Sequence, residues 1–207
     1  MQLYERYRPK TLADVSGHAN ARKRLLKIVS NPHWDRDALW LEGESGIGKT
    51  TLANILADSV CDNDFDIEHV KGTDCTVEKV RWIFDTHSLV SYSQSGWRVC
   101  IVDEAHNMTD RAVEAWLTVL EPLRRNRLYL FTSTEPMKNK AFASRCKRIH
   151  LEHDAETLEA FAVQAMAIAR RENLDGQPVE AYRKLVAACN GNMREILQAI
   201  EAGEMIP

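Results

Sequence analysis

The chain has 207 residues, 44% hydrophobic and 28% charged, which suits a soluble globular protein with one ample domain or one medium and one small domain. Its formal net charge of −3 excludes a global attraction to nucleic acid, so any DNA contact must come from a local patch. The five cysteines lack C-x-x-C spacing, and neither a membrane span nor a signal peptide is visible, so we expect a cytoplasmic protein without disulfides, structural zinc or a membrane partner.

The first 18 residues are polar, and Pro9 biases the backbone before it toward an extended form, so we predict an irregular N-terminal arm. A helix is predicted over 19–30, because its apolar residues share one face. The same helix carries four cations, which either contact DNA or form a solvated face: Arg22, Lys23, Arg24 and Lys27.

The next segment fits the phosphate-binding pattern G-x-x-x-x-G-K-[ST] at every constrained position. It consists of Gly43, Glu44, Ser45, Gly46, Ile47, Gly48, Lys49 and Thr50, with Thr51 directly after it. In such a loop the backbone N–H groups surround the phosphates, Lys49 reaches the β- and γ-phosphates, and the Thr50 hydroxyl binds Mg²⁺. An apolar run at 38–41 predicts a strand over 38–42 before the loop, and a helical stripe to about residue 60 predicts the helix after it. Although a glycine-rich turn can match by chance, we predict a nucleoside triphosphate site.

A second buried strand ends in acidic residues. The apolar run 99–102 is unbroken, as in a strand covered on both faces, and Asp103 and Glu104 follow it directly. Parallel sheets bind ligands at this edge, so Asp103 is expected to hold Mg²⁺ through water and Glu104 to orient the attacking water. A solvated acidic strand end is the alternative, and His106 is either a packing residue or part of the mechanism.

Further strands are predicted at 67–71 and 128–132, with a turn at 72–74 and a polar loop at 91–96. A helix capped by Asp74 or Thr76 follows the turn, and a helix with Trp116 in the core precedes the strand 128–132. That strand ends at Ser133 and Thr134, which either touch the γ-phosphate or cap the strand. Alternating strands and helices predict a parallel α/β fold, and the purely helical pattern from about 154 predicts a second domain.

These motifs together resemble AAA+ ATPases, and among them the clamp-loader subunits of replication factor C and of the bacterial replicase. The N-terminal residues resemble the clamp-loader box near the adenine: Tyr7, Arg8, Pro9, Lys10, Thr11, Leu12, Val15, Ser16, Gly17 and His18. Asp103-Glu104 is similar to Walker B, Thr134 falls at the sensor 1 position with Ser133 as the alternative, and Gly72-Thr73-Asp74 is similar to a short acidic turn. The basic helix that follows this turn in the family makes Arg81 the candidate for a DNA backbone contact.

Two arginines gain their expected roles from the resemblance. Arg145 in Ser144-Arg145-Cys146 matches the arginine finger that reaches the ATP of a neighbouring subunit, although it could also be an ordinary surface arginine. Arg194 in Gly191-Asn192-Met193-Arg194 matches sensor 2 of the lid domain, which contacts the γ-phosphate in cis.

The resemblance implies a parallel five-stranded sheet between helices in residues 1–152, followed by a small helical lid domain in residues 153–207. It also implies ATP and Mg²⁺ as cofactors, ATP hydrolysis, and three kinds of partner: other AAA+ subunits, a sliding clamp and primer–template DNA. Two departures stand out. The cysteine module of bacterial loaders is missing, and the sequence stops after the lid without the collar domain that ties loader rings together. A helicase-loading or transposition-helper ATPase and an ATP-binding regulatory module are therefore the alternatives.

Overall fold

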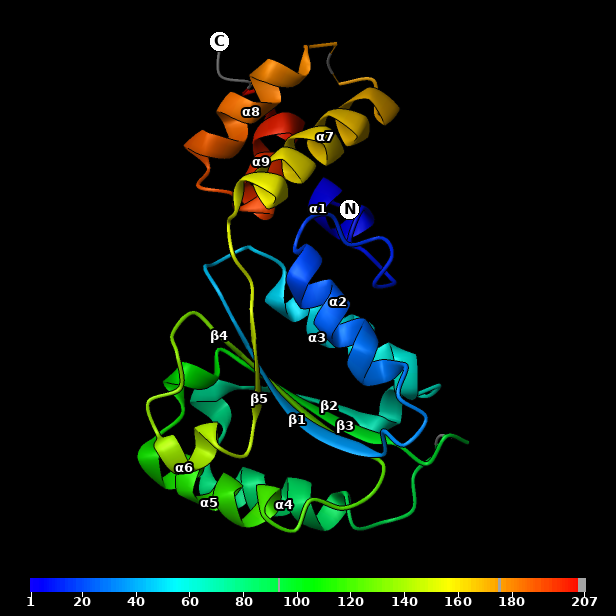
Figure 1. The fold of residues 1–207 in the computed structure, drawn as a ribbon, viewed down its shortest axis with the longest axis vertical. Helices are drawn as coiled ribbons and strands as arrows, with labels where there is room; N and C mark the ends of the chain where they lie inside the picture. Colours follow the sequence, from blue (N-terminus) through cyan, green and yellow to red (C-terminus); the bar gives the residue numbers. More distant parts are fainter. Residues whose placement is uncertain (93, 175, 205–207) are drawn as a thin grey trace.

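The computed structural model describes residues 1–92, 94–174 and 176–204, and its centre is one five-stranded sheet in the order β2-β3-β4-β1-β5 (Figure 1). All neighbouring strands run parallel. The strands are β1 (Arg36–Glu42), β2 (Ile67–Lys71), β3 (Arg98–Asp103), β4 (Arg127–Ser133) and β5 (Lys147–His150). The predicted parallel sheet is confirmed, but sequence reasoning placed only four of its strands and missed β5, in which a single residue is buried.

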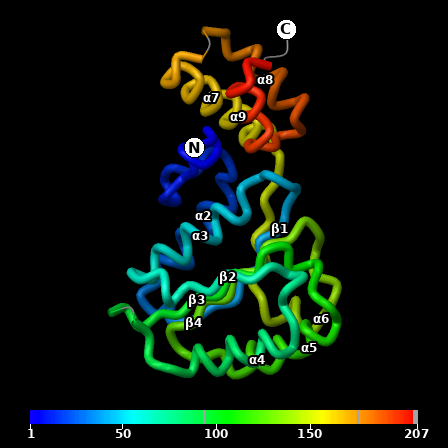
Figure 2. Tube along the Cα trace, turned by 180° about the vertical axis from the view of Figure 1, so that it is seen from behind, coloured from blue at the N-terminus to red at the C-terminus, as the bar shows by residue number. Residues whose placement is uncertain are grey.

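Helices cover both faces of the sheet, which explains why its central strands are unbroken apolar runs (Figures 1 and 2). On one face, Leu39 and Leu41 of β1 belong to a core shared with α2 (Ala19–Val29) and α3 (Lys49–Val60). On the other face, Ala38 and Trp40 belong to a core with α4 (Val77–Thr86), α5 (Asp110–Leu120) and α6 (Lys140–Ala143). Successive residues of a strand point to opposite faces, so β1 joins the two cores. Trp116 of α5 is fully buried, as predicted.

Side-chain caps fix where several helices begin. Thr76 accepts a hydrogen bond from the Lys79 N–H at 3.2 Å, which decides between the two residues predicted to start α4. Thr109, Asp154 and Asn192 cap α5, α7 and α9 in the same way. Each cap satisfies a backbone donor that the first turn of a helix leaves unpaired.

Three helices at the C-terminal end form a separate hydrophobic core, and we call them the lid helices: α7 (Ala155–Arg171), α8 (Val179–Ala188) and α9 (Met193–Ala202). The predicted irregular arm at the N-terminus is wrong, because a short helix, α1 (Leu3–Arg6), packs against α9 (Figure 1). Leu3 is only 3% exposed there, and its burial supplies the apolar contact that orders this otherwise polar segment. The first residues of the chain therefore pack against its last helices.

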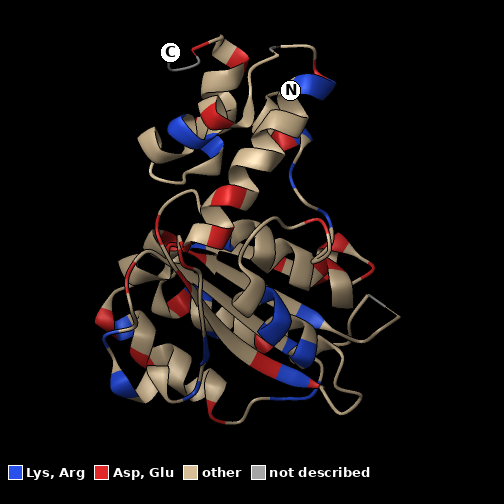
Figure 3. Cartoon of the chain, turned by 45° about the horizontal axis from the view of Figure 1, so that its top comes forward, with Lys and Arg blue, Asp and Glu red and all other residues tan. Residues whose placement is uncertain are grey.

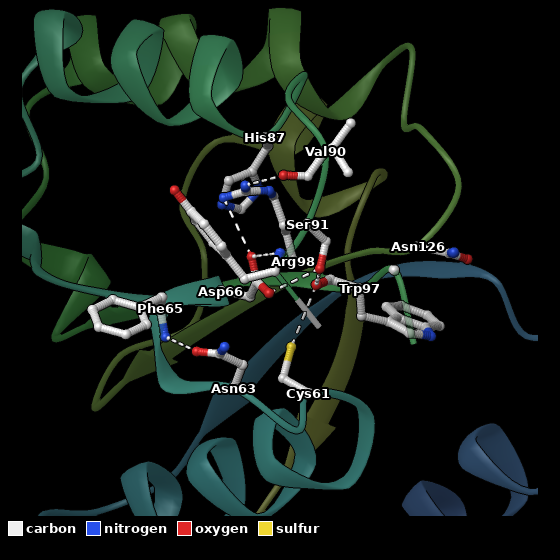
Figure 4. A network of polar contacts seen from close by, with 12 residues as sticks. Cys61, Asn63, Phe65, Asp66, His87, Val90, Ser91, Trp97, Arg98 and Asn126 are labelled. Atoms are coloured by element: carbon white, nitrogen blue, oxygen red, sulfur yellow. Dashed lines mark hydrogen bonds and ion pairs between the residues drawn. The ribbon is translucent and has the colours of Figure 1, made fainter. Parts of the chain in front are cut away.

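A buried polar network holds the segment between α4 and β3 (Figure 4). Asp66 and Arg98 form an ion pair with 3.5 Å between Oδ1 and Nη1, both side chains being almost fully buried. Arg98 also donates to the Val90 carbonyl at 2.6 Å, and the Ser91 hydroxyl donates to Asp66 at 2.8 Å. His87 is buried beside this network and stacks on Tyr129. The predicted loop at 91–96 is confirmed for the residues that the structure describes, whereas Ser93 lies outside them, as do residues 175 and 205–207 of the predicted lid domain.

Within the described part of the chain, no helix combines the length and apolar character that crossing a membrane requires. Basic and acidic residues are interspersed over the sheet layer and the lid helices (Figure 3).

Candidate nucleotide site

The predicted phosphate loop connects the C-terminal end of β1 to the first turn of α3. Gly43, Gly46 and Gly48 have φ values of +155°, +71° and +108°, a region that side chains with a Cβ rarely adopt. A Cβ on Gly46 would lie 1.8 Å from Oδ1 of Asn192, whereas a Cβ on Gly48 would meet nothing within 4 Å. The loop thus passes close to the lid at one glycine and borders open space at another.

Lys49 begins α3, and its ammonium group lies against the loop. Its Nζ donates to the carbonyls of Gly43 at 2.8 Å and Glu44 at 2.6 Å, and the residue is 9% exposed. Burial lowers the pKa of Lys49, and the carboxylates of Asp103, Glu104 and Glu44 oppose this shift. A cation held here would meet an anion in the adjoining space at the N-terminus of α3, where helix geometry also favours negative charge.

The acidic end of β3 lies beside the same helix. The Thr50 hydroxyl donates to Oδ1 of Asp103 at 2.9 Å, so the two residues expected to hold Mg²⁺ are in direct contact. A hydroxyl and a carboxylate are the oxygen ligands that Mg²⁺ prefers, so this pair fits the ion. Glu104 follows in a left-handed conformation, with φ of 53°, which turns the chain sharply after the strand.

Thr132 in β4 joins this group, and sequence reasoning missed it. Its hydroxyl donates to Oδ1 of Asp103 and accepts the backbone N–H of Glu104 at 3.1 Å. The signal was available, because Thr132 is a polar residue in an apolar strand, one step after the registered pair Val102–Phe131. The side chain of Thr132 thus positions both acidic residues.

The two residues weighed for sensor 1 lie just beyond, on either side of His106. Ser133 is fully buried and its hydroxyl donates to the Glu135 carbonyl at 2.5 Å, whereas Thr134 is exposed. Their hydroxyl oxygens are each 3.4 Å from a ring nitrogen of His106. His106 is therefore part of this cluster rather than of the helix core, and the choice between Ser133 and Thr134 stays a prediction.

A cavity of about 340 Å³ extends from the phosphate loop between the N-terminal segment and the lid helices. Its walls include every residue expected to hold the nucleotide except Gly43, Glu44 and Ser45, and they also include Asp103. The N-terminal segment contributes Tyr4, Tyr7, Arg8, Pro9, Val15, Ser16 and His18. The loop and α3 contribute Gly46, Ile47, Gly48, Lys49, Thr50 and Thr51. The lid helices contribute Phe161, Gln164, Met193, Arg194 and Leu197. The guanidinium of Arg194 lies 5.5 Å from the centre of the Tyr4 ring.

Arg145 lies outside this cavity, just after α6. Its guanidinium donates to the Ala141 carbonyl at 2.9 Å and lies 3.5 Å from a carboxylate oxygen of Glu121. The neighbouring residue Cys146 is half-buried, and the burial of its thiol raises the pKa to about 12, which disfavours the reactive thiolate. Within one chain, Arg145 is therefore not brought together with the phosphate loop.

Several known replication proteins are similar to this chain over most of its length. A family profile described as DNA polymerase III, delta subunit, matches residues 62–155. Replication factor C subunit 3 of Blastobotrys adeninivorans is 27% identical in a match covering 96% of this chain and 59% of that protein. DNA polymerase III subunit tau of Escherichia coli is 28% identical, with 98% and 35% covered. The replication factor C small subunit of Haloarcula marismortui is 28% identical, with 97% and 62% covered. These matches support the resemblance to clamp-loader subunits of the AAA+ type.

The fold of this chain is also found among solved structures. The Holliday junction branch migration motor RuvB of Thermotoga maritima matches with a TM-score of 0.72 and 21% identity, covering 94% of this chain and 64% of that chain. The chain spans 59%, 35% and 62% of the three curated relatives named above. The predicted AAA+ fold, a five-stranded parallel sheet between helices with helices after it, is thereby confirmed.

Proposed function

We propose that this chain is an ATP-hydrolysing subunit of a DNA replication clamp loader, with an α/β nucleotide-binding domain in residues 1–152 and a lid domain in residues 153–207. The observation that carries the proposal is the gathering of Lys49, Thr50 and Asp103 at a glycine loop beside open space. ATP would supply the phosphoryl group to be transferred to water, and Mg²⁺ held by Thr50 and Asp103 would supply positive charge that offsets the charge of the phosphates.

The chain's own residues divide the work between binding and hydrolysis. The loop N–H groups and Lys49 bind the phosphates, while Thr50 and Asp103 would hold Mg²⁺. Glu104 orients the attacking water, and Thr132 holds Glu104 and Asp103 in place. Thr134, with Ser133 as the alternative, and Arg194 act next to the γ-phosphate, whereas Tyr7, Arg8, Pro9 and Val15 enclose the base.

Arg145 serves the site of a neighbouring subunit in this proposal. Its place outside the wall of the cavity in its own chain supports action in trans, because a guanidinium must come close to the transferring group to offset its charge. The weak contacts to Glu121 and Ala141 leave the side chain free to exchange partners at low cost, as surface ion pairs are worth about 0–1 kcal/mol. The partners are therefore other AAA+ subunits, which form the interface that completes each site.

A sliding clamp and primer–template DNA are the further proposed partners. Four exposed apolar residues lie in the segments before β2 and β3, and we call them the apolar tip: Phe65 (84% exposed), Leu89 (63%), Val90 (90%) and Tyr92 (73%). Because the strands run parallel, these segments lie at the end of the sheet away from the phosphate loop. Exposed apolar patches of this kind mark protein interaction sites, and the buried Asp66–Arg98 pair holds this one in shape. Arg81 is exposed on α4 and is the candidate for a phosphate contact of DNA.

The proposal is tested by ATP binding and turnover of two variants. Glu104→Gln should bind ATP nearly as well as the wild type but hydrolyse it orders of magnitude more slowly, because it loses the water-orienting carboxylate and no phosphate contact. Lys49→Ala should weaken binding itself. Rapid hydrolysis by Glu104→Gln would contradict the assignment.

The client is tested by adding candidate partners. A clamp and primed DNA should together stimulate turnover more than either alone, since both favour the assembled state that completes the site. Stimulation by a helicase or by single-stranded DNA, without any effect of the clamp, would favour a helicase-loading ATPase instead.

A further inference from the structure

His18 lies where the phosphate loop, the start of α2 and the lid helix α7 meet. The resemblance places it only in the box near the adenine, and the proposed function gives its side chain no task. The residue is 4% exposed. Its Nε2 is 3.0 Å from the carbonyl of Ile47, in the middle of the phosphate loop. Its ring meets that of Phe161 on α7 edge to face, with 5.5 Å between centroids, and its backbone N–H donates to the Thr157 hydroxyl at 2.9 Å. One residue thus contacts the phosphate loop with its side chain and α7 with both side chain and backbone.

The backbone around His18 is held in an unfavourable form by this contact. His18 has φ of 52° and Gly17 has φ of 66°, and a Cβ on Gly17 would lie 2.7 Å from the methyl group of Thr157. A left-handed conformation costs a residue with a Cβ about 1 kcal/mol or more, so tertiary contacts must over-determine it. Glycine at position 17 allows α7 to approach closely enough to provide them.

The histidine is kept neutral with a single N–H group. Burial lowers the pKa of His18, and the hydrogen bond with the Ile47 carbonyl opposes this shift. A carbonyl only accepts, so the bond assigns the proton to Nε2. Nδ1 is buried and makes no hydrogen bond of normal geometry with a described residue, although the Glu152 backbone carbonyl also raises the pKa of His18. Leaving a buried acceptor unpaired costs free energy, which a leucine of similar size would avoid.

We propose that His18 is a positioning residue that sets the direction of the phosphate-loop peptide between Ile47 and Gly48 and ties it to α7. This peptide is a trans, planar unit, so its N–H points opposite to its C=O. Holding the Ile47 carbonyl therefore also fixes the Gly48 N–H, at the glycine that borders open space. Two further contacts join the loop to the lid side: His153 Nδ1 lies 3.3 Å from Oε2 of Glu44, and Asn192 lies against Gly46.

This inference rests on the proposed function, because the fixed N–H is useful only if phosphates bind to the loop. It assigns His18 to the phosphates rather than to the base, although the residue is part of the cavity wall. The loss of the His18 side chain should consequently weaken the binding of a nucleotide more strongly when more of its phosphates reach the loop.

The experiment compares AMP, ADP and ATP binding in Mg²⁺ buffer, by displacement of a fluorescent ADP analogue. His18→Leu removes the donor, and His18→Asn is too short to reach Ile47 but tolerates the left-handed backbone. Both should weaken ADP and ATP about tenfold, as expected for one oriented hydrogen bond to a charged group, and AMP less than threefold. His18→Gln, which carries a donor at similar reach, should stay within threefold of the wild type for all three. The exposed His33 provides the control His33→Leu, which should change nothing.

Several outcomes would overturn the role of His18. Equal weakening of AMP binding and ADP binding would mean that His18 only shapes the cavity. The same loss of affinity in His18→Gln as in His18→Leu would exclude a role for the hydrogen bond to Ile47. Unchanged ADP binding in His18→Asn, even if the Leu variant failed to fold, would have the same meaning. A wild-type chain that binds no nucleotide would overturn the proposed function itself. Coupling to α7 predicts that Phe161→Leu shifts ADP affinity in the same direction, and that the double variant is less than additive.

Discussion

Replacing Thr132 by Val should separate ATP hydrolysis from ATP binding. Thr132 is 1% exposed, so a valine of nearly the same shape fills its place without opening a cavity. The change removes the hydrogen bond to Asp103 and leaves the Glu104 N–H without its acceptor. A hydrogen bond to a charged group contributes about 1.5–3 kcal/mol, and an unsatisfied buried donor costs about 1–3 kcal/mol. If half of this loss falls on the placement of Glu104 in the transition state, kcat decreases roughly 10- to 100-fold.

The assay measures ATP affinity, steady-state kcat and the free energy of unfolding for Thr132→Val, Thr132→Ser and the wild type. ATP affinity should stay within about threefold, because Thr132 is not part of the cavity wall. Thr132→Ser keeps the hydroxyl and should retain most of the activity. Thr118→Val, on the exposed surface of α5, is the matched control and should behave as the wild type. A Val variant with wild-type kcat, or one that loses ATP binding as strongly as turnover, would refute the reasoning.

Three further predictions follow from the same structure. Arg145→Ala and Glu104→Gln should each be inactive alone but recover some ATP turnover when mixed, since one of the interfaces between them then holds both intact groups. Titration of one variant into the other tests this, and a mixture as inactive as its parts would contradict action in trans. Val90→Asp in the apolar tip should abolish the stimulation of ATP turnover by a clamp and leave basal turnover unchanged. The control is Asp85→Asn, at an exposed position of α4, and an equal loss of basal and clamp-stimulated turnover in Val90→Asp would contradict a docking role. Burial lowers the pKa of His87 to about 3, so the folded state stays unprotonated while the unfolded chain gains a proton below about pH 6.5, and stability decreases as the pH falls from 6.5 toward 3. Between pH 7.5 and 5.5 this removes about 1.4 kcal/mol from the free energy of unfolding, measured with urea. His87→Phe should abolish this loss of stability and the control His33→Phe should not, so an unchanged pH dependence in His87→Phe would exclude His87 as its cause.

The sheet and the phosphate loop could be predicted because their signals are local. Gly43, Gly48 and Lys49 lie within one turn of chain, and the unbroken apolar run of β3 records burial on both faces. The edge strand β5 gave no such signal, since its neighbours on one side are absent and only Ile149 is buried. A prediction from periodicity detects burial, so it fails where a strand is short and lies at the edge of its sheet.

The parts of the site that sequence reasoning missed depend on pairing across the fold. Thr132 acquires its place from the parallel register of β3 and β4. The short helix α1 is ordered by packing on α9, which lies almost 200 residues later in the sequence. Tyr4 reaches the cavity for the same reason. A polar residue in an apolar strand was a visible hint, but the partner that satisfies it could not be read from the chain alone.

The cavity is assembled from three regions whose apolar residues belong to two hydrophobic cores, and this decides how a bound nucleotide acts on the molecule. Ile47 and Val15 belong to the sheet core, whereas Leu3 and Phe161 belong to the core of the lid helices. Between these cores the loop and the lid meet through polar or edge-to-face contacts, such as His18 with Ile47 and Phe161. Contacts of this kind are individually weak and can be rearranged without opening either core. A ligand that contacts both the loop and the lid helices therefore shifts the lid helices toward the orientation that it binds more tightly, by an amount set by the difference in its affinity for the two orientations. ATP and ADP would differ in this effect, because only ATP has the third phosphate that Arg194 and the loop would share.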